Sequence, residues 1–128
     1  MKKLLIILLL AVLSTSAMAE WVPISDNDIA TNYVDPATIR KAGNKVKMWV
    51  MDNYKTMQGD GEYKHLSSKS QFEYDCQNET FTSVANLTHS GNMGSGQVVT
   101  SFSKRSDPMP VPPGSIGEFI WKKVCGKQ

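Results

Sequence analysis

The stretch SQFEYDCQNETF, Ser70–Phe81, alternates apolar and polar side chains and then places a cysteine in the apolar row. Phe72, Tyr74 and Cys76 fall on one side of an extended chain, and the residues between them, which are polar, fall on the other. This period of two predicts a strand with one face in the core. Such a thiol can form a disulfide, belong to a redox pair or a metal site, or remain an inert thiol, and the rest of the sequence indicates which.

The N-terminus predicts export. Lys2 and Lys3 precede an apolar run, Leu4–Leu13, that is too short to span a bilayer, and Ala17–Ala19 offers a cleavage site of the A-x-A type. We therefore expect residues 1–19 to be a signal peptide and the mature chain to begin at Glu20. Since Glu20 is not a cysteine, we expect no lipoprotein anchor and a periplasmic or secreted product.

Cys76 and Cys125 are the two cysteines of the chain. A redox pair would need the C-x-x-C spacing, and a zinc site would need two more ligands, whereas His65 and His89 lack zinc-motif spacing. An exported protein meets an oxidising compartment, so the sequence predicts a structural disulfide between these cysteines.

The length and composition of the mature chain predict one small domain, residues 20–128, with a net charge near zero. Two of the 14 basic residues, Lys2 and Lys3, belong to the leader, so the others balance the 12 acidic residues. The sequence therefore gives no electrostatic reason to expect nucleic-acid binding. We also expect no membrane span after cleavage of the signal peptide.

Strand patterns recur along the mature chain with short connections. They cover residues 20–25, 29–34, 45–56, 70–76, 80–90 and 98–104. In the fifth of these, Phe81, Ala85 and Leu87 should share one side. Residues 35–44 read as a turn with one or two helical turns, and the proline-rich residues 105–114 as an extended connector. Consecutive strands with short links favour an antiparallel meander.

A short amphipathic helix should close the chain. Ser115, with Glu118 three residues later, forms a capping box, and Gly126 suits the position after the last turn. Cys125 lies on this helix, so packing the helix on the sheet would bring it to Cys76. The predicted fold is α+β: one antiparallel meander sheet of about five or six strands, with a C-terminal helix packed on one face and tied by a disulfide.

Several of these segments resemble the surface-adhesin protein E family. They are YVDPATI at 33–39, VKMWVM at 46–51, FEYDC at 72–76, GSGQVV at 94–99 and the closing PPGSIGE and VCG, together with Trp21 after the leader. The resemblance implies a small antiparallel sheet with a disulfide-tied C-terminal helix. It also implies binding to host matrix and serum proteins, and dimerisation.

No catalytic constellation stands out in the sequence. The glycines of GNMGSGQ, residues 91–97, precede a strand pattern rather than a helix with a lysine, so they read as a turn and not a phosphate loop. Serine, histidine and aspartate are present, but the G-x-S-x-G motif is not. We expect no enzyme activity, no metal and no cofactor.

The strand at 45–56 carries two apolar rows, and the sequence leaves open which one the helix covers. Lys45, Lys47, Trp49 and Met51 share one face, opposite the row that begins at Val46. If the helix covers the Val46 row, then Lys45, Lys47, Trp49 and Met51 form a face for a protein partner or for a second copy of the chain. If it covers the Trp49 row, that face is core.

The function that these observations predict is that of a non-enzymatic exported binding protein of a bacterial envelope, similar to surface-adhesin protein E. The alternative is a soluble periplasmic accessory or stress protein without a role in host adhesion. A small periplasmic hydrolase or inhibitor is the more remote alternative.

Overall fold

One antiparallel sheet and one α-helix make up the part of the protein that the structure, a computed structural model, describes, residues 20–127. The strands are β1 Val22–Asp26, β2 Ala30–Val34, β3 Arg40–Ala42, β4 Lys45–Gln58, β5 His65–Asp75, β6 Thr80–His89, β7 Val98–Phe102 and β8 Met109–Pro110. The helix is α2, Ile116–Cys125, and three single 3-10 turns are η1 Pro36–Thr38, η2 Gly61–Tyr63 and η3 Asn92–Gly94. The α+β class is confirmed, and the sheet has eight strands rather than five or six.

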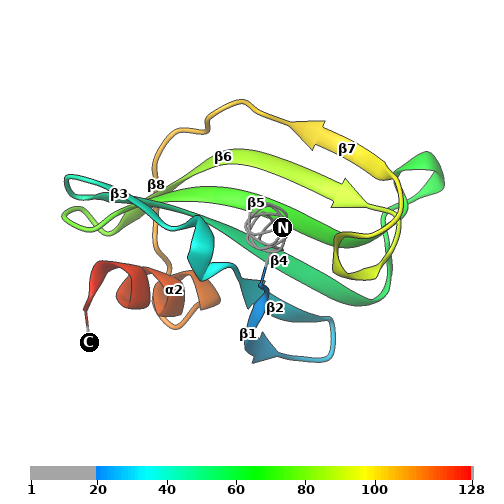
Figure 1. The fold of residues 1–128 in the computed structure, drawn as a ribbon, viewed down its shortest axis with the longest axis horizontal. Helices are drawn as coiled ribbons and strands as arrows, with labels where there is room; N and C mark the ends of the chain where they lie inside the picture. Colours follow the sequence, from blue (N-terminus) through cyan, green and yellow to red (C-terminus); the bar gives the residue numbers. More distant parts are fainter. Residues whose placement is uncertain (1–19, 128) are drawn as a thin grey trace, which may run out of the picture.

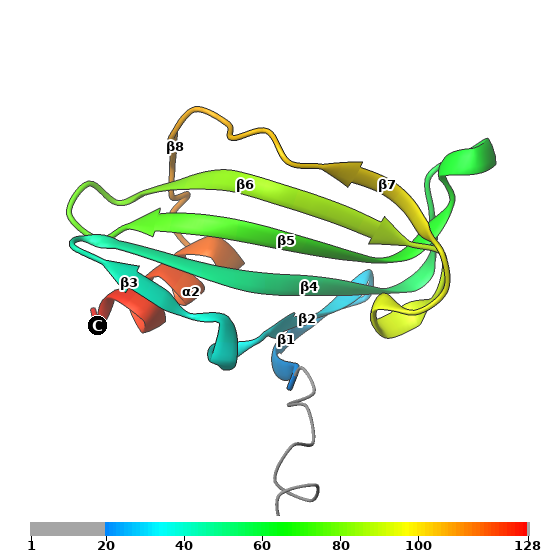
Figure 2. The ribbon, with the colours of Figure 1, turned by 45° about the horizontal axis from the view of Figure 1, so that its top comes forward.

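The sheet is a meander with the order β1-β2-β4-β5-β6-β7, and all its pairs are antiparallel. The long strands β4, β5 and β6 run side by side across the molecule, and α2 lies beneath one end of them (Figures 1 and 2). β1 and β2 form a hairpin on the same side as α2 (Figure 2). As Pro23 predicted, β1 lies at an edge of the sheet.

The two strands that sequence patterns missed are short additions outside this order. The predicted helical segment at 35–44 contains the single turn η1, in which Asp35 Oδ1 accepts the Ala37 N–H at 3.2 Å. Arg40–Ala42 then pairs with the start of β4 as β3, and Met109–Pro110 pairs with β6 as β8. All five residues of these two strands are exposed, so neither strand needs the alternating apolar row by which a strand is recognised in a sequence.

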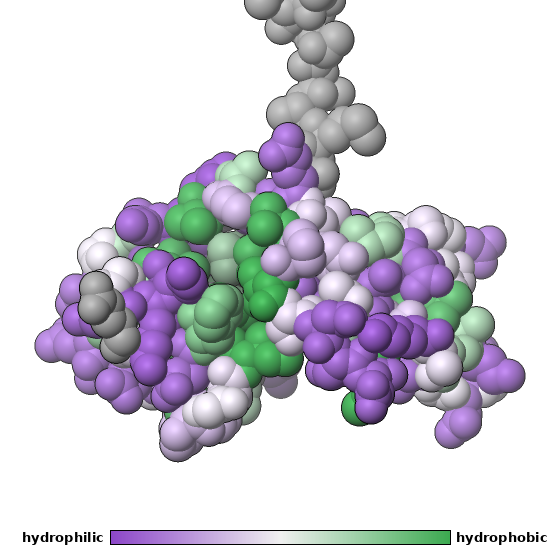
Figure 3. Space-filling view, turned by 90° about the horizontal axis from the view of Figure 1, so that it is seen from below, coloured by the Kyte–Doolittle hydropathy of each residue, from purple (hydrophilic) through white to green (hydrophobic). Residues whose placement is uncertain are grey.

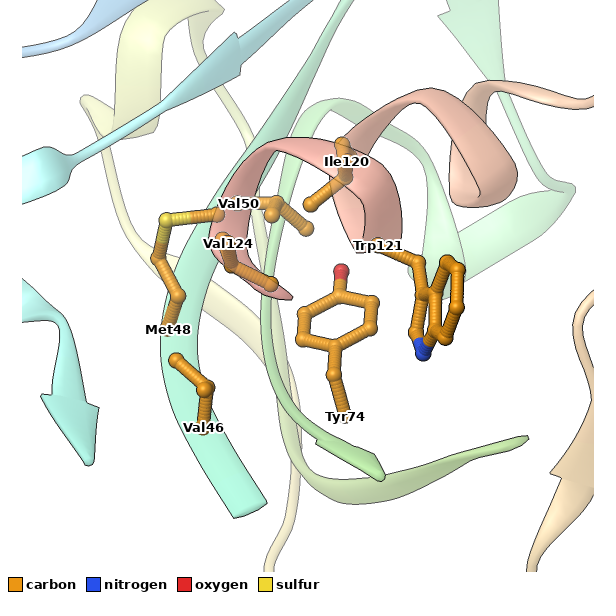
Figure 4. Close-up of a cluster of buried hydrophobic side chains, with 7 residues drawn as sticks. All are labelled: Val46, Met48, Val50, Tyr74, Ile120, Trp121 and Val124. Atoms are coloured by element: carbon orange, nitrogen blue, oxygen red, sulfur yellow. The ribbon is translucent and has the colours of Figure 1, made fainter. Parts of the chain in front are cut away.

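The helix packs on the Val46 row of β4, which answers the question that the sequence left open. Val46, Met48 and Val50 from β4 and Tyr74 from β5 form a buried cluster with Ile120, Trp121 and Val124 of α2. Figure 4 shows the Tyr74 ring pointing from its strand toward the helix, between the β4 side chains and Trp121. The Trp49 row therefore lies on the opposite face of the sheet.

Asp75, the last residue of β5, and Cys76, which follows it, make two further contacts with the helix. Cys76 and Cys125 form the predicted disulfide, which joins positions 49 residues apart. Trp121 Nε1 donates to the Asp75 carbonyl oxygen at 2.8 Å. The thiol that ended the apolar row of β5 thus meets the helix that covers that row.

The capping box is present in a modified form. Ser115 Oγ accepts the Glu118 N–H at 3.1 Å, as predicted, whereas the Glu118 carboxylate accepts the N–H of Gly114 at 3.3 Å instead of the N–H of Ser115. Gly126 follows the helix with a φ of 67°, a left-handed conformation that glycine adopts without strain.

A β-bulge corrects the expected side-chain row of β6. Gln71 pairs with Ala85, but Phe72 pairs with Ser83, so Val84 has no partner and the alternation shifts by one residue. Phe81 consequently packs against the core below α2, whereas Leu87 faces the other side of the sheet beside Trp49. The prediction that Phe81 and Leu87 share one side was wrong, because a strand pattern alone does not reveal a bulge.

Candidate functional site

A mostly apolar groove with a volume of about 480 Å³ lies between α2 and the β1–β2 hairpin. Figure 3 shows a band of hydrophobic residues along the middle of this face, bordered by polar surface on both sides. Most of its wall is aliphatic and aromatic, namely Ile24, Ile29, Ala30, Tyr33, Val50, Met51, Phe72, Tyr74, Phe81, Pro112, Ile116 and Ile120. We call this hollow the hairpin–helix groove.

The groove exists because α2 is shorter than the sheet face that it covers. The ten residues of α2 pack over Val46, Met48 and Val50, and the same face of β4 continues to Asp52 and Tyr54 without a helix above it. The β1–β2 hairpin forms the opposite wall, where Ile29 is 62% exposed. Apolar surface thus remains open between the helix and the hairpin.

Within this mostly apolar wall, one polar pair lies where β2 meets β4. Asn32 of β2 and Asp52 of β4 are cross-strand partners, and the Asn32 amide donates a hydrogen bond to Asp52 Oδ1. Burial raises the pKa of the Asp52 carboxyl, while this hydrogen bond acts in the opposite direction. Burial, together with the Asp52 charge, also raises the pKa of Tyr54.

On the opposite face of the sheet, the structure places the predicted partner residues side by side. Trp49 is half-buried and lines a shallow hollow of about 260 Å³ together with Trp21 and Leu87. Lys45 is exposed, with its Nζ 3.8 Å from Glu73 Oε1. This surface, formed by Trp21, Lys45, Lys47, Trp49 and Leu87, is called the Trp49 face below.

Met51 differs from the other predicted partner residues because its side chain is 0% exposed. It lies in the row of Trp49 but belongs to the interior. Met51 is therefore a core residue in this structure, and the Trp49 face reaches the surface through its tryptophans and lysines. Whether that face binds a partner stays a prediction.

A buried imidazole lies farther along the same face. His89 is 7% exposed, and within the described residues neither ring nitrogen has a hydrogen-bond partner. Burial and the nearby Lys69 ammonium lower the pKa of His89. The η3 turn lies close by, where Ser67 Oγ donates to the Gly91 carbonyl at 2.7 Å and accepts the Gly94 N–H at 2.9 Å.

Residues 20–127 contain no group of three or more His, Cys, Asp or Glu side chains that could hold a metal ion. Within the same residues, no helix is both long enough and apolar enough to cross a membrane. The predicted signal peptide, residues 1–19, lies outside the described part of the chain.

Sequence reasoning missed the hairpin–helix groove. Its wall combines residues from β1, β2, β4, β5, β6, the proline-rich connector and α2, which no local pattern brings together. Two signals pointed toward it: Ile29 at the entrance to β2, and Ile116 at the start of an amphipathic helix that is too short for the sheet. Both are exposed apolar side chains in the structure.

Comparison with known proteins gives one family and one fold. The family model described as surface-adhesin protein E matches residues 21–126. Crystal form II of Haemophilus influenzae protein E superposes with a TM-score of 0.66 at 14% identity, covering 88% of this chain and 91% of that one.

A structure of protein E from non-typeable Haemophilus influenzae gives a TM-score of 0.61 at 14% identity, covering 88% and 79% of the two chains. At this identity the two structures show a shared fold. No curated protein matches this chain. Because the family model spans nearly all of the described residues, the chain belongs to the surface-adhesin protein E family.

Proposed function

We propose that this protein is an exported, non-enzymatic binding protein that attaches to a protein partner through the Trp49 face. The family is one of surface adhesins, a kind of protein that is exported and is not an enzyme. The observation that carries the proposal is the pair of half-buried tryptophans, Trp21 and Trp49, around a shallow hollow on the sheet face opposite α2.

The composition of the Trp49 face supports contact with a protein. Aromatic side chains are enriched at protein interfaces because they bury a large area at a small cost in conformational entropy. Lys45 and Lys47 lie in the same row of β4 as Trp49 and supply a polar rim. Behind this face, the disulfide and the packed α2 keep the sheet rigid, which limits the entropy lost on binding.

The partner that the family suggests is a host matrix or serum protein. An accessory role in the periplasm would use the same face for an envelope protein. Cell fractionation separates the two roles: exposure on the outer surface supports adhesion, and release by osmotic shock supports the periplasmic role. A second copy of the chain is a further occupant to be tested.

The test compares the mature wild-type domain with Trp49→Ala and with Tyr63→Ala as the matched control. Tyr63 is an aromatic residue of η2 that is 58% exposed and lies outside the Trp49 face. Binding to immobilised matrix proteins and to envelope extract is measured together with molecular mass by light scattering. We expect Trp49→Ala to weaken binding to one of these partners at least about tenfold while Tyr63→Ala leaves it unchanged.

Circular dichroism and thermal denaturation report whether Trp49→Ala still folds. Loss of self-association in Trp49→Ala alone would identify the partner as a second copy of the chain. If Trp49→Ala folds and binds as the wild type does, the Trp49 face is not the binding surface. If it loses only stability, Trp49 serves as a core residue.

A further inference from the structure

We propose that the hairpin–helix groove binds a small amphipathic amine, whose apolar or aromatic body fills the groove and whose ammonium group pairs with Asp52. This site lies on the face of the sheet that α2 packs against, opposite the Trp49 face. It therefore goes beyond the proposed attachment to a protein and does not depend on it.

The size and the wall of the groove fit a small ligand. Its volume of about 480 Å³ falls in the range of small-molecule sites, which are mostly apolar with a few polar groups. The hydrophobic band in Figure 3 follows this hollow between the helix and the hairpin. Phe72 and Phe81, whose ring centroids are 5.6 Å apart, present an aromatic surface inside it.

Charge complementarity decides the class of ligand. Among the described residues that line the groove, Asp52 is the only one that carries a formal charge, and no lysine or arginine lines it. A ligand with a carboxylate or phosphate would meet this negative charge without a cation to offset it. A cation attached to an apolar body matches both the charge and the wall.

One unmet hydrogen-bond acceptor locates the charged end of the ligand. Asp52 Oδ1 accepts from the Asn32 amide, while Oδ2 accepts no hydrogen bond from any described residue. The neighbouring Asn32 Oδ1 also lacks a donor, but less than 1 Å² of this atom is exposed, so Asp52 Oδ2 is the acceptor that a ligand can reach. A primary ammonium has three N–H donors and no acceptor, so it suits this carboxylate oxygen.

Burial of these acceptors favours a small molecule over a folded partner. Asn32 is buried and Asp52 is only partly exposed, so a donor has to enter the groove to reach the carboxylate. The partial burial that raises the pKa of Asp52 also strengthens its attraction for a cation that displaces water from the site.

The experiment uses three probes that differ only in the head group: 4-phenylbutylamine, 4-phenylbutanol and 4-phenylbutanoate. Binding to the mature domain is followed by amide chemical shifts in NMR titrations. We expect the amine to bind at least about tenfold more tightly than the alcohol, because an ionised hydrogen-bonded pair forms only with the amine. The carboxylate should bind more weakly than the alcohol.

Two variants test which residues contact the charged head and the apolar body of the ligand, and a third is a control. Asp52→Asn keeps the shape of the side chain, and we expect it to reduce amine affinity to that of the alcohol without changing alcohol affinity. Asp60→Asn removes the same charge from an exposed position at η2 and should change neither. Ile116→Ser shortens the apolar wall at the start of α2 and should weaken the amine and the alcohol together.

Equal affinity for the amine and the alcohol in the wild type would overturn the proposal, as would shifts confined to residues outside the groove. Failure of all three probes to bind at millimolar concentration would also overturn it. If Asp52→Asn does not fold, the Ile116→Ser variant and the wild-type comparison of amine with alcohol decide the question. Loss of protein attachment in Trp49→Ala has no bearing on any of these readouts.

Discussion

Replacing both Cys76 and Cys125 by alanine should lower the free energy of unfolding by about 4 kcal/mol. The disulfide joins residues 49 positions apart, so it closes a loop of roughly 50 residues in the unfolded chain. In the chain-entropy model, a loop of this length loses about 14 cal/mol/K, which corresponds to about 4 kcal/mol at 25 °C.

The folded variant should nevertheless keep α2 in place. Ile120, Trp121 and Val124 remain buried against the sheet, and the hydrogen bond from Trp121 Nε1 to the Asp75 carbonyl does not depend on the disulfide. The loss of stability should therefore come mainly from the unfolded state, which gains conformational freedom when the cross-link is removed. Cys125 is a partly buried neighbour of the core, so the alanine variant adds a smaller packing loss.

Urea denaturation followed by far-ultraviolet circular dichroism measures this loss. With a urea m-value of about 2 kcal/mol/M, the midpoint should fall by about 2 M. Wild-type protein reduced under denaturing conditions and refolded with its thiols blocked provides a control without a substitution. A midpoint within about 0.3 M of the oxidised wild type would refute the reasoning, because the cross-link would then not constrain the unfolded chain.

Three further predictions concern single side chains. Ser115→Ala should lower the free energy of unfolding by about 1 kcal/mol, because the Glu118 N–H loses its acceptor; the urea midpoint measures it. Met51→Ala should cost about 2–5 kcal/mol in the same assay, since Met51 is fully buried. Stability should decrease as the pH falls below about 6.5, because burial and Lys69 lower the pKa of His89 and the unfolded chain then binds a proton that the folded chain does not. Thermal denaturation between about pH 5 and 8 should show a smaller decrease for His89→Leu.

Residues of the same type provide the controls for these variants. Ser103→Ala and Met57→Ala, at exposed positions, should each change stability by less than about 0.5 kcal/mol. His65→Leu is the histidine control: His65 is half-buried and contacts the Tyr54 ring and the Tyr63 carbonyl, so this variant should lose some stability at every pH without changing the acid sensitivity. An unchanged midpoint in Ser115→Ala would show that the Ser115 cap does not stabilise the protein. A Met51→Ala variant as stable as Met57→Ala would contradict the burial of Met51, and equal acid sensitivity of His89→Leu and the wild type would contradict the assignment to His89.

Local sequence patterns were sufficient wherever the physical cause is local. The period of two in β4 and β5, the cap at Ser115 and the left-handed Gly126 predicted the long strands and both ends of α2. The pairing of Cys76 with Cys125 followed from compartment and from the placement of both thiols beside apolar rows. The strands and the helix ends are determined by residues that are neighbours in the chain. The disulfide joins distant residues, but it could be predicted because the chain has two cysteines and export brings them to an oxidising compartment.

Apart from the disulfide, features that depend on distant residues could be recognised only from the tertiary structure. Both rows of β4 are apolar, so the choice between the Val46 and Trp49 faces was made by the docking of α2, through Trp121 and Cys125. The bulge at Val84 depends on the register of β6 against β5, and the short strand β3 depends on a partner strand instead of an alternating pattern of its own.

The hairpin–helix groove belongs to the second class as well. In the sequence, Asp52 is an ordinary polar residue of a strand. In the structure, Asn32 of β2 lies beside it, and the sheet next to it is not covered by α2. The sequence by itself determined which segments become strands and helix, because side-chain alternation and capping act over a few residues. The tertiary structure alone decided which faces are covered and which stay open, because that depends on how far a short helix reaches across a wide sheet.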